Sequence, residues 1–240
     1  MPAQIQHPSF PQPENREMRL WRYMDFTKFV ALISSANLFF CRADLFRDPF
    51  EGSYSKVNLS MRPEIYKDIP GTESILTQMS DFYKRVRGLT FINCWHANEY
   101  ESAAMWDLYA KTNEAVAIET TYEKLQNILP NEAFLGCVKY IDYETDWLPE
   151  GNSFNPFMHK RKSFEHEREV RSVIQEIKGN NTDAQPSGIS VPIVLDEMIS
   201  SIHVAPTAPD WFADLVTEVS AKYDLTIGVK RSDLYSDPVF

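Results

Sequence analysis

The chain has 240 residues, and its hydrophobic fraction of 43% is typical of a globular protein with a sizeable core. Its net charge of −10 argues against non-specific binding to nucleic acid or to anionic membranes, because contact with phosphates needs a basic surface. The three cysteines form no Cys-x-x-Cys pair and support neither a zinc knuckle nor a disulfide framework.

Residues 1–17 are rich in Pro, Gln, Asn and Ser and offer little to bury. We therefore predict a mobile N-terminal arm, followed by a single domain over residues 18–240. No apolar run approaches the roughly 18 residues of a membrane span, and the N-terminus lacks the pattern of a signal peptide. We expect a cytoplasmic protein with no membrane partner.

Hydrophobic periodicity predicts strands and helices that alternate irregularly along the chain. The predicted strands are Arg19–Met24, Leu38–Arg42, Leu89–Trp95, Ala115–Thr120, Phe134–Tyr143, Ser172–Glu176, Ile189–Leu195, Ile202–Ala205 and Leu225–Lys230. Helices are predicted after Asp25, over Thr72–Arg87, from Glu101 to Thr112, over Thr121–Leu129 and from Pro209 to Tyr223. Such irregular alternation favours an α+β fold with a mixed or antiparallel central sheet flanked by helices.

The first predicted strand carries Arg22 on its inward face and Tyr23 on the other. An inward guanidinium needs a partner, because unpaired burial of a charge is costly. The candidates are a carboxylate, from Glu167 or Glu169, and a phosphate of a bound substrate.

A loop after the second strand contains Asp48-Pro49-Phe50-Glu51, in which a rigid turn displays two carboxylates. Such carboxylates bind Mg²⁺ or a ribose hydroxyl. The alternative is an ordinary turn in which Asp48 caps its own backbone.

The strand that ends at Trp95 and His96 leads into a polar loop and a short helix. A histidine beside a tryptophan is either structural or, at the start of a polar loop, part of a site. Ser102, Trp106 and Tyr109 share one row of the helix, and we expect this row to form the aromatic wall of a pocket.

Glu167-x-Glu169-x-Arg171 is the strongest candidate for chemistry. On a strand these side chains point the same way, which places the two carboxylates about 7 Å apart. Two close carboxylates separate in pKa, and an adjacent arginine holds one of them ionised. The alternative is a solvated strand face, or a helix end where Glu167 pairs with Arg171.

Five segments resemble a bacterial family known as domain of unknown function 2971. They are Leu20-Trp21-Arg22-Tyr23, Phe46-x-Asp48-Pro49-Phe50-Glu51, Cys94-Trp95, Ser102-x-x-Met105-Trp106-x-x-Tyr109, and Phe164 to Arg171. The similarity extends from about residue 19 to about residue 232, although Arg47 stands where the family more often has Asn. The resemblance implies a bacterial protein but no established reaction.

A second, fold-level resemblance is to ADP-ribosyltransferases, which have an Arg or His on an early strand and a Glu-x-Glu or single Glu entering a late strand. Arg22 and Glu167-x-Glu169 stand in similar places in the chain order, although no Ser-Thr-Ser motif is evident. The resemblance implies NAD⁺ as a substrate, Glu169 as the catalytic carboxylate and Glu167 as its helper. It also implies that Arg22 holds the pyrophosphate.

Our leading hypothesis is an enzyme that acts on a nucleotide-like ligand by ADP-ribosyl transfer or NAD⁺ cleavage, as a toxin or defence effector. The predicted ligand-binding residues are Arg22, Tyr23, Asp48, Glu51, Trp95, His96, Ser102, Trp106, Tyr109 and Arg171, with Tyr23, Trp106 or Tyr109 stacking on nicotinamide. One alternative is a metal-dependent phosphodiesterase or nuclease that uses Asp48, Glu51, Glu167 and Glu169. Another is a non-catalytic ligand- or protein-binding module in which the Glu/Arg cluster is structural.

Overall fold

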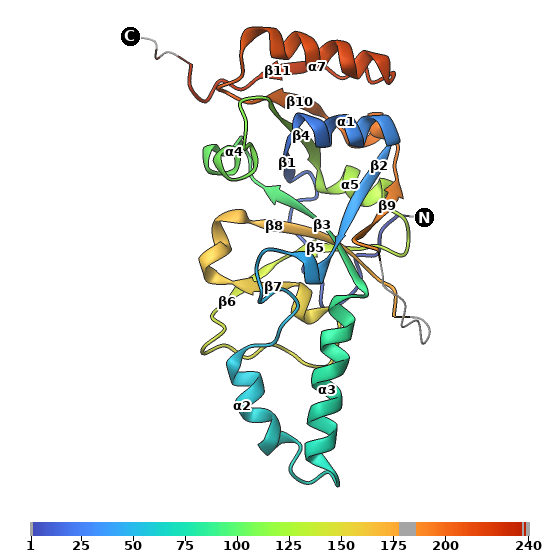
Figure 1. Cartoon of the computed structure of the whole chain (residues 1–240), viewed down its shortest axis with the longest axis vertical. Coiled ribbons are helices and arrows are strands. Elements are labelled where there is room, and N and C mark those ends of the chain that lie inside the picture. Colours follow the sequence, from blue (N-terminus) through green and yellow to red (C-terminus); the bar gives the residue numbers. More distant parts are fainter. Residues whose placement is uncertain (1, 178–185, 237, 239–240) are drawn as a thin grey trace.

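The computed structural model describes residues 2–177, 186–236 and 238 of the chain. The molecule is elongated, with a large sheet in its middle (Figure 1). Helix α7 (Asp210–Lys222) lies at one end, and a hairpin of α2 (Lys56–Ile65) and α3 (Thr72–Arg87) projects from the other.

The sheet is mixed, with nine strands among the described residues, which confirms the predicted α+β fold. Its strands are β1 (Arg19–Asp25), β2 (Asn37–Arg42), β3 (Thr90–Ala97), β4 (Ala115–Thr121), β5 (Phe134–Cys137), β8 (Glu169–Gln175), β9 (Gly188–Pro192), β10 (Ser201–Val204) and β11 (Val229–Arg231). The strand order is β11-β10-β4-β1-β3-β2-β9, and β8 pairs with β3 and β5. Neighbours are antiparallel, except that β10 and β11 are parallel.

The helices form where apolar spacing and caps favour them. Helix α1 (Phe26–Ser35) buries Phe29, Leu32 and Ile33 and ends at Ala36, which is left-handed with φ 48°. Helices α4 (Ala103–Tyr109) and α5 (Tyr122–Ile128) begin after Ser102 and Thr121, whose side chains accept hydrogen bonds from backbone amides in the first turn. Helix α6 (Leu195–Met198) is a single turn.

The prediction of one long strand over Phe134–Tyr143 is wrong, because the chain leaves the main sheet after β5. The Val138 amide donates to the Glu169 carbonyl, and the next amide, of Lys139, donates to Met158 instead. The chain then forms β6 (Lys139–Ile141), which pairs with β7 (His159–Arg161) in a separate two-stranded sheet.

Two strands share one edge of β3 and leave a gap between them. The register of β3 with β2 ends at Ile92, and its register with β1 begins at His96. The stretch from Asn93 to Trp95 therefore lies beside a gap, where β1 and β2 diverge. Strand β8 pairs with the other edge of β3, from Thr90 to His96.

The prediction that the N-terminal arm has little to bury is wrong. The Ala3 amide donates to the Gln126 carbonyl at 3.0 Å, and Phe10 is 2% exposed. Phe10 stacks on Phe134 with ring centres 5.3 Å apart. Gly136 permits this approach, because a Cβ there would lie 2.8 Å from the Phe10 Cβ. One large aromatic ring thus anchors a segment whose other residues are mostly polar.

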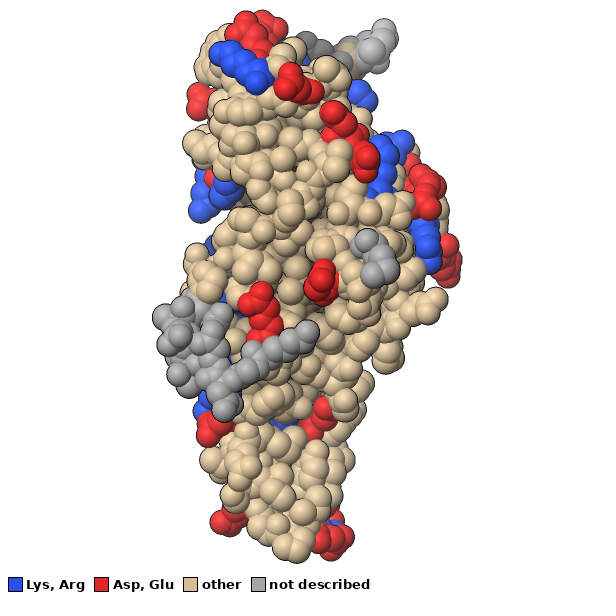
Figure 2. Space-filling view, turned by 90° about the vertical axis from the view of Figure 1, so that its right-hand side faces the viewer, with Lys and Arg blue, Asp and Glu red and all other residues tan. Residues whose placement is uncertain are grey.

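On the face drawn in Figure 2, acidic and basic side chains lie scattered among neutral residues, and no broad basic surface forms there. No helix among the described residues has the length and apolar character that crossing a membrane requires.

We expect Phe10→Ala to lower the free energy of unfolding by about 3–5 kcal/mol, because it leaves a cavity between Phe134 and the backbone of Gly136. Urea denaturation followed by tryptophan fluorescence measures the change. Gln6→Ala, on an exposed side chain of the same arm, is the control and should change stability by less than about 0.5 kcal/mol. Equal stability of both variants would show that the arm does not pack in solution.

Candidate functional site

Arg171 lies at the centre of a buried ion network. Its side chain is fully buried, and its Nη1 and Nη2 donate to the Glu51 carboxylate oxygens at 2.6 and 2.9 Å. Its Nε donates to Glu169 Oε2 at 2.5 Å, and Nη1 also donates to the Phe157 carbonyl. Burial disfavours the charged form, but Glu169 and Glu51 outweigh it and raise the pKa of Arg171.

Lys160 is the member of this network that the sequence did not predict. It lies in β7, and its Nζ donates to Glu169 Oε1 at 2.7 Å and to Glu167 Oε2. Burial lowers its pKa, but the charge of Glu169 and the bond to Glu167 reverse the direction and raise it. Lys160 lies in a short run of basic residues, and that pattern does not predict burial. Its partners, Glu167 and Glu169, follow at and after a turn that the sequence pattern did not predict.

Glu167 does not lie on the strand, contrary to prediction. It ends the 3-10 helix η3 (Lys162–Glu167), and Arg168 follows in a left-handed conformation with φ 39° before β8 begins at Glu169. The turn at Arg168 breaks the alternation that would have placed both carboxylates on one strand face. Lys160 nevertheless brings them together, since it binds both.

The two carboxyl groups differ strongly in proton affinity. Burial, the hydrogen bond to Glu169 and the charge of Glu169 raise the pKa of Glu167 to about 7. Burial also acts to raise the pKa of Glu169, but Arg171, the hydrogen bond from Glu167 and Lys160 outweigh it and lower that pKa. One carboxylate therefore stays ionised, while its neighbour exchanges a proton near neutral pH.

The loop from Phe46 to Gly52 does not display two carboxylates, contrary to the sequence prediction. Glu51 is 3% exposed and faces Arg171, so it is not displayed. Asp48 accepts hydrogen bonds from the Phe50 amide at 3.1 Å and from Arg161 Nη2 at 2.8 Å, which agrees with the alternative of a self-capped turn. Gly52 adopts φ 71°, and a Cβ there would lie 2.4 Å from the Phe157 ring.

The carboxylates proposed as metal ligands face protein cations instead. Glu51 and Glu169 bind Arg171, Glu167 binds Lys160 and Asp48 binds Arg161. Among residues 2–177, 186–236 and 238, no three His, Cys, Asp or Glu side chains are placed to hold a metal ion. The arrangement therefore gives the metal-dependent alternative no support.

Arg22 follows the last residue of β1 that pairs with β3, and its side chain lies against Trp95. Its guanidinium carbon lies 5.8 Å from the centre of the Trp95 ring, and its buried Nη1 has no hydrogen-bond partner. Burial lowers its pKa, while Cys94 and Tyr109 act in the opposite direction. No carboxylate of the described residues pairs with Arg22, so of the two predicted partners neither Glu167 nor Glu169 fills that role.

His96 carries a second unsatisfied atom close by. Its Nδ1 lies 2.7 Å from the Glu167 carbonyl, and burial lowers its pKa. A neutral imidazole beside a carbonyl must donate from Nδ1, which leaves Nε2 as an acceptor. Nε2 is buried and has no hydrogen-bond partner.

The predicted aromatic wall is mostly core. Tyr23, Trp95 and Trp106 are nearly inaccessible, and Tyr109 is 43% exposed. The Tyr23 hydroxyl accepts from the Ser102 amide at 2.8 Å, while the Ser102 hydroxyl caps α4. Burial raises the pKa of Tyr109, with Glu167 the next contributor, which places its phenol in the field of the carboxylate pair. Of the three rings predicted to stack on a ligand, Tyr109 is the one with an accessible face.

A second polar chain lies under α4. His203 Nδ1 lies 3.1 Å from Glu101 Oε1, and its Nε2 lies 2.8 Å from the Ser201 hydroxyl. This order resembles that of a nucleophilic serine and its base, but Ser201 donates its proton to Glu119 Oε2 at 2.5 Å. Glu101 also accepts from Trp106 Nε1 at 3.0 Å. The chain ties α4 to the sheet.

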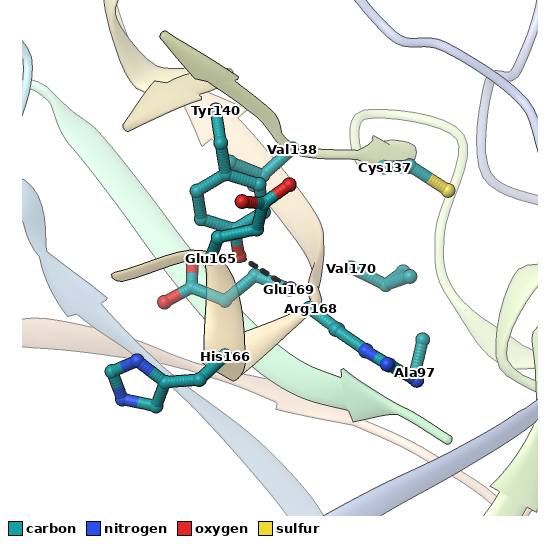
Figure 3. A pocket seen from close by; sticks show the side chains of 9 residues that line it. All are labelled: Ala97, Cys137, Val138, Tyr140, Glu165, His166, Arg168, Glu169 and Val170. Atoms are coloured by element: carbon teal, nitrogen blue, oxygen red, sulfur yellow. Dashed lines mark hydrogen bonds between the residues drawn. The ribbon is translucent and has the colours of Figure 1, made fainter. Parts of the chain in front are cut away.

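Glu169 lines a surface hollow of about 500 Å³ (Figure 3). Its wall includes Glu165, His166, Arg168 and Glu169, and the Tyr140 hydroxyl accepts from the Glu169 amide at 2.8 Å. Arg22 and Tyr109 do not line this hollow. Neither residue with an unsatisfied atom, Arg22 or His96, lines this hollow.

Comparison with known proteins gave no relative. No protein-family model matches the chain, and neither the curated proteins nor the solved structures include a match. The resemblance to domain of unknown function 2971 stays a prediction from sequence motifs, and the function must be argued from the site.

We expect Glu51→Gln to lower the free energy of unfolding by about 3–5 kcal/mol, because it leaves the buried Arg171 charge undercompensated. Glu165→Gln, on an exposed side chain, removes the same charge and should change stability by less than about 0.5 kcal/mol. Chemical denaturation of both variants at pH 8 tests this. A small effect at Glu51 would mean that water reaches the network.

The raised pKa of Glu167 predicts a pH-dependent stability. The carboxyl ionises near 4.5 in the unfolded chain and near 7 in the folded protein. Between these values the folded protein keeps a proton that the unfolded chain has released, so this group makes stability fall as pH rises. Glu167→Gln removes that contribution and should gain about 1–2 kcal/mol relative to the wild type between pH 4.5 and 8, after allowance for solvent screening. Denaturant titrations at several pH values measure the difference, and a constant difference would contradict the assigned pKa.

Proposed function

We propose that this protein is an enzyme that binds a nucleotide-like ligand beside Arg22 and His96 and cleaves or transfers at an N-glycosidic bond, with NAD⁺ as substrate. One observation carries the proposal. Arg22 Nη1 and His96 Nε2 are buried polar atoms without partners on the neighbouring strands β1 and β3, and His96 Nδ1 lies 2.7 Å from the backbone carbonyl of Glu167, whose carboxyl has a pKa of about 7. Buried unsatisfied polar groups are costly, and a ligand that pairs with them removes the cost.

Arg22 supports an anionic ligand. Its charge is not compensated by a carboxylate in the described chain, and a guanidinium matches the geometry of a phosphate. Tyr109, with its partly exposed ring, offers a face on which a base stacks. His96 Nε2 accepts from a hydroxyl, as a ribose supplies. Together these groups fit a ligand that contains phosphate, sugar and an aromatic ring.

The geometry favours Glu167 over Glu169 as the reacting carboxyl, which reverses the roles that the resemblance implied. Both oxygens of Glu169 accept from cations, one from Lys160 and one from Arg171. Glu167 has a single cation partner, Lys160, and carries the proton that it shares with Glu169. We therefore assign Glu169 as the ionised group that holds the proton on its neighbour.

The proposed reaction balances without a cofactor. The bond between the ribose carbon and the nicotinamide nitrogen breaks, and nicotinamide leaves with the bonding electrons. The oxygen of water or of another acceptor forms the new bond, and its proton passes to the Glu167 carboxylate. Ionised Glu169 favours the cationic character that develops on the sugar.

A non-catalytic binding module is the second candidate. The saturation of Glu169 by two cations is what a structural ion network also shows. Such a module would bind an anion at Arg22, as the proposed enzyme does, but would not convert the ligand to a product.

We expect the purified protein to release nicotinamide from NAD⁺, measured by liquid chromatography, with a rate that rises as pH increases through about 7. Glu167→Gln should reduce kcat by about 10²–10⁴-fold. Arg22→Met should raise KM by about 10–100-fold, because it removes a charged hydrogen bond to phosphate. Glu165→Gln is the control and should leave both parameters unchanged.

Full NAD⁺ turnover by the Glu167→Gln protein would contradict the assigned mechanism. NAD⁺ that binds with Arg22-dependent affinity but is never cleaved, with or without a protein acceptor, would replace the enzyme by the binding module.

A further inference from the structure

The α2–α3 hairpin exposes large apolar side chains, while the residues that α2 buries are polar. It projects from the body of the molecule (Figure 1), and the residues that α2 buries are polar, Asn58 and Arg62. Both bind Glu150, through Nδ2 of Asn58 at 2.9 Å and Nε of Arg62 at 2.9 Å. Helix α2 is therefore fastened to the body by buried polar bonds.

Several large apolar side chains of the hairpin are exposed. In these two fully described helices, the one buried apolar residue is Val86. Five large apolar side chains of the hairpin are between 44% and 56% exposed: Leu59, Met61, Ile65, Ile69 and Phe82. On α3 itself Phe82 is the exposed large apolar side chain, while Ile75, Leu76, Met79 and Tyr83 are half-buried. Exposed apolar side chains on a helix pair indicate a surface that another protein element covers in the assembled state.

We propose that a second copy of this chain covers the hairpin, so that two hairpins pack antiparallel into a four-helix bundle. The charges select this partner and this orientation. The tip, residues 64–73, carries Glu64, Asp68 and Glu73 against Lys67 and has a net charge of −2. The last turns of α3, residues 81–87, carry Lys84, Arg85 and Arg87 against Asp81 and have a net charge of +2. These residues are all exposed, except that Arg87 is half-buried.

An antiparallel pair places the acidic tip of one hairpin against the basic end of the other, twice, about a two-fold axis. Such an interface is self-complementary and closed, as dimer interfaces are. The 16 residues of α3 give a helix of about 24 Å, long enough for several layers of apolar side chains at the crossing. A parallel pair would set like charges together at both ends. The inference does not depend on the reaction proposed above.

Sedimentation velocity of the full chain over a range of concentrations tests the assembly. The wild type should form dimers at micromolar concentration, and Phe82→Glu should weaken dimerisation at least about 100-fold, because it places a charge in the apolar contact. Val194→Glu is the matched control. It adds the same charge at a side chain that is 54% exposed outside the hairpin, and it should dimerise like the wild type.

Charge reversal tests the orientation. A tip-reversed protein (Asp68→Lys with Glu73→Lys) and an end-reversed protein (Lys84→Glu with Arg85→Glu) should each self-associate about tenfold more weakly or worse. An equimolar mixture should recover dimers, since opposite charges then meet at both ends. A monomeric wild type, a Phe82→Glu dimer of unchanged affinity, or a mixture that fails to associate would each overturn the proposal.

Discussion

The buried guanidinium of Arg171 is the constraint on which the site depends. It holds Glu51 from an early loop, the Phe157 carbonyl and Glu169 in one cluster, and Glu169 in turn holds Lys160. A charge without water must be compensated, so segments far apart in the sequence have one permitted arrangement. Apolar residues of similar volume often stabilise a core as well or better. The network therefore fixes how these segments are arranged around Arg171 more than it contributes to the free energy of unfolding.

That arrangement also has a chemical consequence. Burial raises the pKa of Glu167, and Glu169, which two cations keep ionised, raises it further because its negative charge disfavours a second ionisation beside it. The proton affinity of Glu167 is thus set by residues that do not touch a ligand. The left-handed turn at Arg168 contributes as well, because it takes Glu167 off the strand while Lys160 keeps both carboxyls within reach.

Local pattern predicts the elements well and the contacts between them poorly. The helix over Thr72–Arg87 has the predicted bounds, because its stripe and its basic last turn are encoded within the helix. The splitting of the pKa values of Glu167 and Glu169 also follows from their closeness in sequence. The pairing of Glu51 with Arg171 spans 120 residues, and no periodicity records it. Phe10 was missed for the same reason, since it stacks on Phe134. Lys160 was missed although Glu167 and Glu169 are close in sequence, because a non-periodic turn brings them to it.

The unsatisfied atom of Arg22 differs in kind from others in the molecule. Arg62 and Arg161 also have a buried nitrogen without a partner, but each binds a carboxylate through another nitrogen, so its charge is compensated. Arg87 lacks a partner at Nε yet donates to the Pro49 carbonyl. Arg22 has neither kind of partner among the described residues, and it lies where β1 and β2 diverge. A buried, uncompensated guanidinium is stabilised when an anion joins it, which is why the proposed ligand site lies beside Arg22 and not at the hollow that Glu169 lines.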